Sequence, residues 1–145
     1  MRDVHTTLGA ITIAVNAIAA LLGLFGFVRS PVRAFWFILR AGQILVILDA
    51  VIGAALLLDG KDLPRLHLIY GLVPIAVSFV AEQLRLASAD IELQKRDLEN
   101  AQQVATLPEE DQQALVAGII RRETGVMAAS AAVVALLCLR AQGWL

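Results

Sequence analysis

The two histidines of the chain stand near the start of long apolar segments, and a glycine follows each histidine four residues later. His5 precedes Gly9, and His67 precedes Gly71. On a helix, residues four positions apart lie on the same face, one turn from each other. A glycine there removes the side chain beneath the imidazole and leaves a flat surface. A planar macrocycle ligated by histidine needs such a surface, so the spacing is typical of a haem site.

The composition of the chain excludes an ordinary soluble domain. Its 145 residues are 59% hydrophobic and 17% charged, against roughly 45–50% and 25% in soluble proteins, and the mean hydropathy is +0.74. A soluble chain of this size cannot bury so much apolar surface. A single cysteine excludes an internal disulfide, and the net charge of −1 gives no basis for binding nucleic acid. We therefore expect a multi-pass protein of the cell membrane, in contact with the lipid bilayer.

Four apolar stretches approach the length of about 20 residues that crosses a bilayer. They cover about residues 5–28, 34–58, 66–87 and 120–140, and the fourth is short enough that its helix should begin earlier. None shows the alternation of a strand, and helices satisfy their own backbone hydrogen bonds in lipid. The predicted fold class is all-α: a four-transmembrane-helix bundle that forms a single membrane domain over 1–145.

The segment 88–119 is polar and charged, and we expect it to form a helical hairpin. Three apolar residues, Ile91, Leu98 and Ala105, follow one another every seven positions, a spacing typical of a seam between helices. The seam is expected to continue the third helix and to face Leu115 and Ile119. The hairpin is either a solvated connector or a surface that docks a membrane-protein partner.

The next helix after this seam has a predicted start signal. The run Thr106–Glu109 matches a capping box, with Pro108 in the first helical turn.

The distribution of Lys and Arg predicts the orientation, because cytoplasmic ends are enriched in these residues. Of the twelve, eight fall on the side of the hairpin and four on the side of the termini. The eight are Arg29, Arg33, Arg40, Arg85, Lys95, Arg96, Arg121 and Arg122, and the four are Arg2, Lys61, Arg65 and Arg140. We therefore expect a cytoplasmic hairpin and extracytoplasmic termini. The arginines on the cytoplasmic side are also candidates for contact with anionic lipid.

The first and third apolar stretches align without a gap at an offset of 62 residues. Eight of twenty aligned positions are identical, including His5 on His67 and Gly9 on Gly71. Matches among Ala, Val and Leu weigh little because apolar helices use few residue types, whereas the matching histidines weigh more. The alignment predicts an internal repeat about a pseudo-two-fold axis along the membrane normal.

In a four-helix bundle the first and third helices can lie diagonally, so two imidazoles can approach one iron from opposite sides. We expect His5 and His67 to ligate haem b in this way. Gly53 lies at a comparable depth and would clear another edge, Tyr70 would form a wall, and Lys61 and Arg65 would pair with the propionates. The alternative is that both histidines are interfacial and the glycines only allow close helix packing.

The order of elements that begins at His5 resembles one four-helix half of the heme A synthase family. The residues that carry the resemblance are His5, the run Asp49–Gly53, the run Leu56–Leu58 and His67, within about residues 5–86. In that family each half holds a haem site with paired histidines, and the intervening helix has a Gln-x-x-Leu-Gly pattern. The chain is also similar to small four-helix membrane proteins of bacteria.

Two departures limit what this resemblance implies. Asp49 stands where the family has glutamine, and no glutamate precedes His5 by one turn. The resemblance therefore implies a haem-binding scaffold rather than the family's hydroxylation chemistry.

Asp49 is the one acidic residue deep in a predicted span, which makes it a functional candidate. We expect it to form a polar network with Asn16 and Gln43. Three functions follow from these features: haem binding with electron transfer or haem handling, a structural subunit that docks through 88–119, and a small proton-coupled transporter that uses Asp49. The sequence has no nucleophile–base pair and no phosphate-binding loop, so we expect no catalytic residue, and enzymatic activity stays an open question.

The orientation can be tested with single cysteines in a Cys138→Ala background. Asp3→Cys should react with a membrane-impermeant maleimide added to intact cells, because the termini are expected outside. Asn100→Cys should react only after the membrane is opened. Labelling of position 100 in intact cells would contradict the orientation.

Overall fold

The computed structural model describes residues 2–29, 32–59 and 65–145, and within these ranges it is helical without strands. The helices are α1 (Arg2–Val28), α2 (Arg33–Leu58), α3 (Arg65–Leu86), α4 (Ser88–Gln94), α5 (Ala101–Val104) and α6 (Glu109–Ala141). Four helices are long and apolar enough to cross a membrane: α1, α2, α3 with its extension through Gln94, and α6. The prediction of an all-α protein with four helices long and apolar enough to cross a membrane is confirmed.

The first three spans begin and end within a few residues of their predicted limits. The fourth span belongs to a helix of 33 residues that begins at Glu109, well before its apolar part, as expected from the short apolar stretch. Three acidic residues, Glu109, Glu110 and Asp111, occupy the first turn of α6. Negative charge is favourable there because the amino end of a helix carries a partial positive charge.

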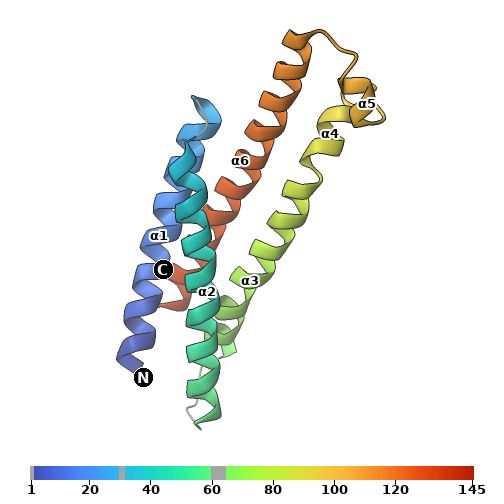
Figure 1. Ribbon diagram of the computed structural model, residues 1–145. Coiled ribbons are helices and arrows are strands. Elements are labelled where there is room, and N and C mark those ends of the chain that lie inside the picture. The colour runs from blue at the N-terminus through green and yellow to red at the C-terminus, as the bar shows by residue number, and fades with distance from the viewer. Residues whose placement is uncertain (1, 30–31, 60–64) are drawn as a thin grey trace.

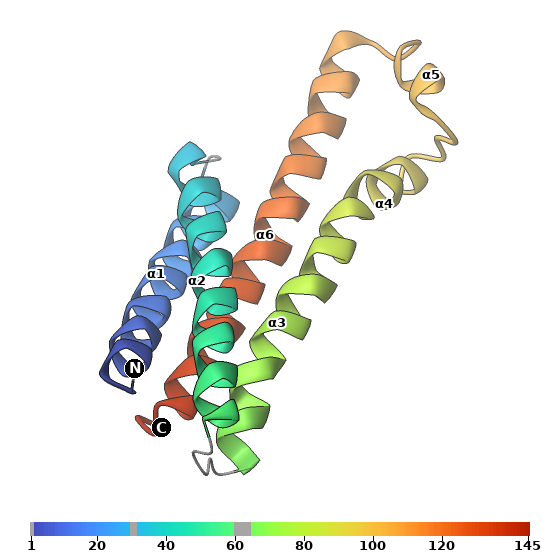
Figure 2. The same ribbon diagram turned by 60° about the horizontal axis from the view of Figure 1, so that its bottom comes forward.

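The helices pack around a central pair, α1 and α6. Helix α2 packs on α1, and α3 packs on α6, whereas α2 and α3 contact each other sparsely. The two helices that carry the histidines, α1 and α3, are therefore diagonal neighbours, as the views in Figure 1 and Figure 2 show. The chain termini, the end of α2 and the beginning of α3 lie at one end of the bundle.

Small residues set the close approach of α1 and α6. A Cβ atom built on Gly23 would lie 2.6 Å from the Cβ of Ala128 and 2.6 Å from Cε2 of Phe35. A Cβ atom on Gly125 would lie 2.9 Å from the ring of Phe27. In lipid there is no hydrophobic force between helices, so such close contacts supply much of the association energy.

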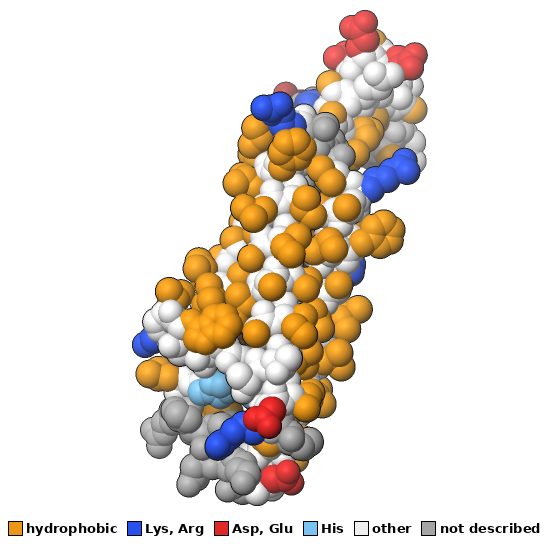
Figure 3. Space-filling model, turned by 90° about the vertical axis from the view of Figure 1, so that its left-hand side faces the viewer, with side chains coloured by type: hydrophobic (Ala, Val, Ile, Leu, Met, Phe, Trp, Pro, Cys, Tyr) orange, Lys and Arg blue, Asp and Glu red, His pale blue; other side chains and the backbone are white. Residues whose placement is uncertain are grey.

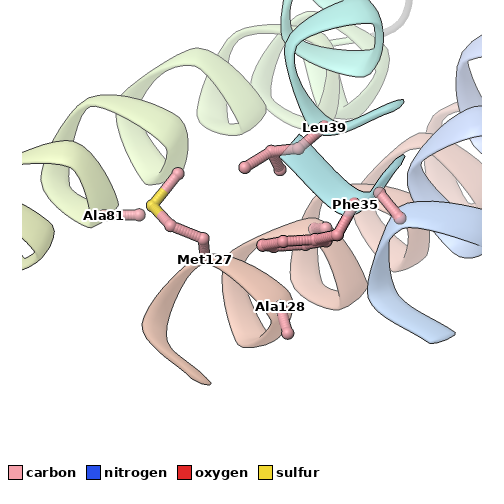
Figure 4. Packing of buried hydrophobic residues seen from close by; sticks show 7 residues of the cluster. Phe35, Leu39, Ala81, Met127 and Ala128 are labelled. Atoms are coloured by element: carbon pink, nitrogen blue, oxygen red, sulfur yellow. The ribbon is translucent and has the colours of Figure 1, made fainter. Parts of the chain in front are cut away.

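A core cluster joins all four long helices. It consists of Ala19, Phe35, Leu39, Ala81, Met127, Ala128 and Ala131, five of which Figure 4 labels. Phe35 and Leu39 from α2 are each 1% exposed, and Met127 from α6 is 0% exposed. The large apolar side chains on the outer surface are exposed, and charged side chains gather toward the two ends (Figure 3). This distribution suits a bundle surrounded by lipid.

The segment that follows α3 turns back onto α6 (Figure 1). Helix α4 continues α3 after an interruption at Ala87 and packs on α6, where Leu115 is 2% exposed. Glu92 of α4 accepts hydrogen bonds from Lys95 and Arg96. Its Oε2 would lie 3.0 Å from a Cβ atom built on Gly118 of α6. A glycine at that position thus allows α4 to approach α6.

Two details of the predicted hairpin are wrong. The seam does not run through Ala105 on one helix, because the helix ends at Gln94 and Asp97 adopts a left-handed φ of 54°. Ala105 is exposed. The capping box does not form either: the Thr106 hydroxyl donates to the carbonyl of Gln103.

The position of Pro108 explains why the box is not formed. Pro108 has an extended ψ of 148° and is itself the N-cap of α6, without a side-chain cap hydrogen bond. The predicted register therefore placed the proline two positions too far into the helix.

The contact between α1 and α6 can be tested by adding one methyl group. We expect Gly23→Ala to lower the free energy of unfolding by about 1–3 kcal/mol, because overpacking forces the helices apart. Gly71→Ala is the matched control, since nothing lies within 4 Å of the added Cβ there. Thermal or denaturant unfolding of the purified proteins in the same detergent gives the comparison. Equal stability of the two variants would contradict the proposed contact.

Candidate functional site

The two histidines meet at the end of the bundle that holds both termini. Their ring centroids are 5.8 Å apart, and the ring planes make an angle of 77°. His5 comes from the first turns of α1 and His67 from the first turn of α3. Because α1 and α3 are diagonal, the imidazoles reach across the bundle toward each other. The structure thus brings together the two residues that the sequence singled out as a pair.

Each histidine has a polar partner at Nδ1. The Nδ1 atom of His67 lies 2.9 Å from the carbonyl oxygen of Ala141 at the end of α6. A carbonyl only accepts hydrogen bonds, so Nδ1 carries the hydrogen and Nε2 carries a free lone pair. Metal-binding histidines are commonly oriented by this kind of contact to a carbonyl or a carboxylate.

The partner of His5 is a carboxylate on the neighbouring helix. Nδ1 of His5 lies 2.9 Å from Oδ1 of Asp49 on α2, and both side chains are about one-fifth exposed or less, at 17% and 20%. The contact lacks the alignment of a hydrogen bond, and neither atom has another hydrogen-bond partner in the part of the chain that the structure describes. The two side chains are therefore in close polar contact without an aligned hydrogen bond.

The three glycines proposed to clear a surface differ in their surroundings. Gly53 lies beneath His5, since a Cβ atom there would be 3.3 Å from Cε1 of the imidazole. Gly71 faces open space, with nothing within 4 Å of the corresponding position. At Gly9, however, a Cβ atom would collide with the side-chain amide of Gln142. Gly71 therefore leaves room for a ligand, whereas the imidazole of His5 lies over Gly53 and a glutamine occupies the space above Gly9.

A cavity of about 160 Å³ adjoins the histidines. Side chains from all four long helices line it, and most are apolar. Tyr70 is among the lining residues, and the Arg140 guanidinium lies 5.9 Å from the centre of its ring. Arg65 begins α3 at the same end, but its side chain lies outside the described residues, as does Lys61.

The predicted network of Asp49, Asn16 and Gln43 does not form. Asn16 is 2% exposed and donates a hydrogen bond to the carbonyl of Thr12 on its own helix. It faces Gly42, whose Cβ position would be 3.0 Å from the amide. Gly42 precedes Asp49 by seven residues, or about 10 Å along the helix. Asn16 therefore lies too far along the bundle to contact Asp49.

Gln43 belongs instead to a polar cluster on α2 and α3. Its Nε2 donates to Oε1 of Glu82 at 3.0 Å, and Glu82 also pairs with Arg40 and Arg85. The pairing of Arg40 with Glu82 across the two helices satisfies charges that would be costly in lipid.

Two contributors to the site could not be found by sequence reasoning. The carbonyl of Ala141 is a backbone group, and no residue type marks it as a partner of His67. Gln142 stands at the end of α6, and its Nε2 donates to the carbonyl of Thr6 at 3.4 Å. The sequence shows only that Gln142 is a polar residue directly after the last apolar helix. This position does not indicate where its side chain points.

The fold and site together define a class: a multi-pass helical bundle with two imidazoles facing each other at one end. No group of three or more metal-ligating side chains occurs among the described residues. Comparison of the chain with protein-family models, with curated proteins and with solved structures finds no match.

The contact between His5 and Asp49 can be measured with a double-mutant cycle. We expect His5→Ala and Asp49→Ala each to destabilise the protein, because each leaves a partly buried polar group without its partner. The double variant should lose less free energy of unfolding than the two single variants lose together. The difference, which is the coupling free energy, should be about 0.5–3 kcal/mol. Unfolding of the four purified proteins in one detergent provides the values. Strict additivity would contradict a direct contact.

Proposed function

We propose that this protein binds haem b, with His5 and His67 as its two axial ligands. The observation that supports the proposal is the pair of facing imidazoles, 5.8 Å apart between ring centroids. Two imidazoles at this separation could hold one metal ion between them, because metal–imidazole bonds are about 2 Å long. Only two protein ligands are needed, because the porphyrin supplies the other four.

The contacts at Nδ1 favour the same proposal. Ala141 orients His67, and Asp49 lies against His5, so Nε2 of each ring is available as a ligand atom. A carboxylate or carbonyl partner raises the basicity of a ligating imidazole and fixes its orientation. Asp49 is then a positioning residue of the haem site. This role accounts for an acidic residue in an apolar helix, so proton-coupled transport is not needed to explain it.

The size of the cavity sets a condition on binding. Its volume of about 160 Å³ is below the range of about 300–1,000 Å³ that holds typical ligands and cofactors. Haem binding therefore requires the walls to part. Helices α2 and α3 contact each other sparsely, and Gly71 faces open space. The cavity walls therefore part on this side of the bundle with the smallest loss of contacts.

The bound group supplies one-electron exchange with a redox partner, or is itself the cargo. Residues of the chain hold and orient it: the imidazoles bind, Asp49 and Ala141 keep the rings in place, and apolar cavity walls limit the access of water. With the termini extracytoplasmic, the site lies near the outer face and the hairpin lies in the cytoplasm.

The proposal includes the internal repeat about an axis along the membrane normal. Helices α1 and α2 supply His5 with its partner Asp49, and helices α3 and α6 supply His67 with its partner Ala141. Each helix pair thus contributes one imidazole and the group that orients it. The similar packing of α1 on α2 and of α3 on α6 supports a pseudo-two-fold relation, from which the bundle departs because α1 packs on α6 far more closely than α3 packs on α2.

Haem binding is tested by absorption spectroscopy of the purified protein titrated with haem. We expect a Soret band and the low-spin spectrum of bis-histidine ligation. His5→Ala and His67→Ala should each abolish the low-spin spectrum, and imidazole added to His67→Gly should restore it, which separates ligand loss from misfolding. Gly71→Leu should block binding by filling the open space, whereas Gly71→Ala should bind normally. Absence of a Soret band, or a low-spin spectrum unchanged in both histidine variants, would overturn the proposal.

A further inference from the structure

The end of the bundle opposite the histidines carries arginines that form no salt bridge. Arg40, Arg85, Lys95 and Arg96 each pair with a glutamate. Within the described ranges, Arg29 at the end of α1 and Arg121 and Arg122 on α6 have no such carboxylate partner. The positive charge of these three side chains is therefore available to a ligand.

The three arginines border two adjoining hollows between α1 and α6. One, of about 630 Å³, is lined by Arg29 and Arg121 together with Glu109 and Gln112. The other, of about 690 Å³, begins at Arg122 and has almost entirely apolar walls. Phe27 lines both hollows, and the Arg121 guanidinium lies 4.8 Å from the centre of its ring. A charged compartment thus adjoins an apolar groove.

A polar atom without a partner points to a ligand at their junction. Nε of Arg122 is buried and has no hydrogen-bond partner among the described residues. Leaving such a donor unsatisfied is costly, so an acceptor oxygen is expected against it. Guanidinium groups bind phosphate oxygens particularly well because their donors are fixed in a plane.

The dimensions of the apolar groove suit an acyl chain. It extends along α6 from Arg122 to Ala132, ten residues or about 15 Å of helix. Its floor consists of small residues such as Gly125, Ala128 and Ala129, and exposed Leu21 and Leu24 of α1 form its wall. The groove thus has apolar walls along α6, with Arg122 at one end.

From this arrangement we propose a binding site for one anionic phospholipid, independent of haem. The phosphate is held by Arg122, Arg121 and Arg29, and one acyl chain fills the groove between α1 and α6. Among the described residues that line the two hollows there are three cations and one carboxylate, Glu109, whose Oε1 accepts a hydrogen bond from Gln113. This excess of positive charge favours an anionic headgroup over a zwitterionic one, and anionic lipids are abundant in the cytoplasmic leaflet.

The experiment compares phosphatidylglycerol with phosphatidylcholine as ligands of the delipidated full-length protein in detergent, by native mass spectrometry. We expect preferential retention of phosphatidylglycerol. Arg122→Gln and Arg121→Gln should each weaken it by about tenfold, equivalent to about 1.4 kcal/mol, as expected for one charge-assisted hydrogen bond. Arg33→Gln is the matched control, because Arg33 is exposed at the same end of the bundle and lines neither hollow.

A second pair of variants tests the acyl groove. Ala132→Trp should displace the lipid by filling the groove, whereas Leu136→Trp, one turn further along α6 on the exposed surface, should leave binding unchanged. Helical circular dichroism and the thermal midpoint verify that each variant is folded. Equal binding of both lipids, equal effects of Arg33→Gln and Arg122→Gln, or displacement of the lipid by inorganic phosphate despite an intact groove would overturn the proposal.

Discussion

The close contact between α1 and α6 is the constraint on which the rest of this bundle depends. Lipid offers helices no hydrophobic reason to associate, so shape and short-range contact must hold them together. Gly23 meets Ala128, and Gly125 accommodates Phe27, which brings the two helices close along their length. Helix α2 then packs on one member of this pair and α3 on the other. The consequence is an uneven bundle, dense through its centre and sparsely joined between α2 and α3, and the cavity at the histidines lies where the packing is weakest.

The polar groups of the bundle fall into two sets, those with a hydrogen-bond or ion-pair partner within the chain and those without one. The first set supports the packing of the helices, and the second lies at the proposed binding sites. Glu82 illustrates the first set, since Arg40, Arg85 and Gln43 all contact it. Such pairing is the usual way in which charged side chains are tolerated beside lipid. The second set contains Nε of Arg122, Nδ1 of His5 and Oδ1 of Asp49, which have no hydrogen-bond partner among the described residues. Because buried polar groups in native proteins nearly always have partners, these atoms support the two binding sites proposed above.

The sequence predicted the features that depend on the length and composition of each segment. It did not predict the contacts that depend on the register between helices. Apolar length located all four spans, and His5 and His67 stood out because of their shared spacing to glycine. The relative depth of α1 and α2 is not encoded in either sequence alone, so Asp49 was assigned to Asn16 rather than to His5. A seven-residue period likewise cannot detect the left-handed residue Asp97 that ends the helix. Backbone groups such as the carbonyl of Ala141 have no residue type that reveals them.

The distribution of the site over two helix pairs has a mechanical consequence. His5 and Asp49 belong to α1 and α2, whereas His67 and Ala141 belong to α3 and α6, so the contact that orients each ring lies within one pair. The spacing between the rings is the dimension that depends on how the pairs are inclined to each other. Helices adjust their tilt to the thickness of the surrounding bilayer. A change in tilt between the two pairs would therefore alter the gap between the imidazoles before it altered the contact that orients either ring.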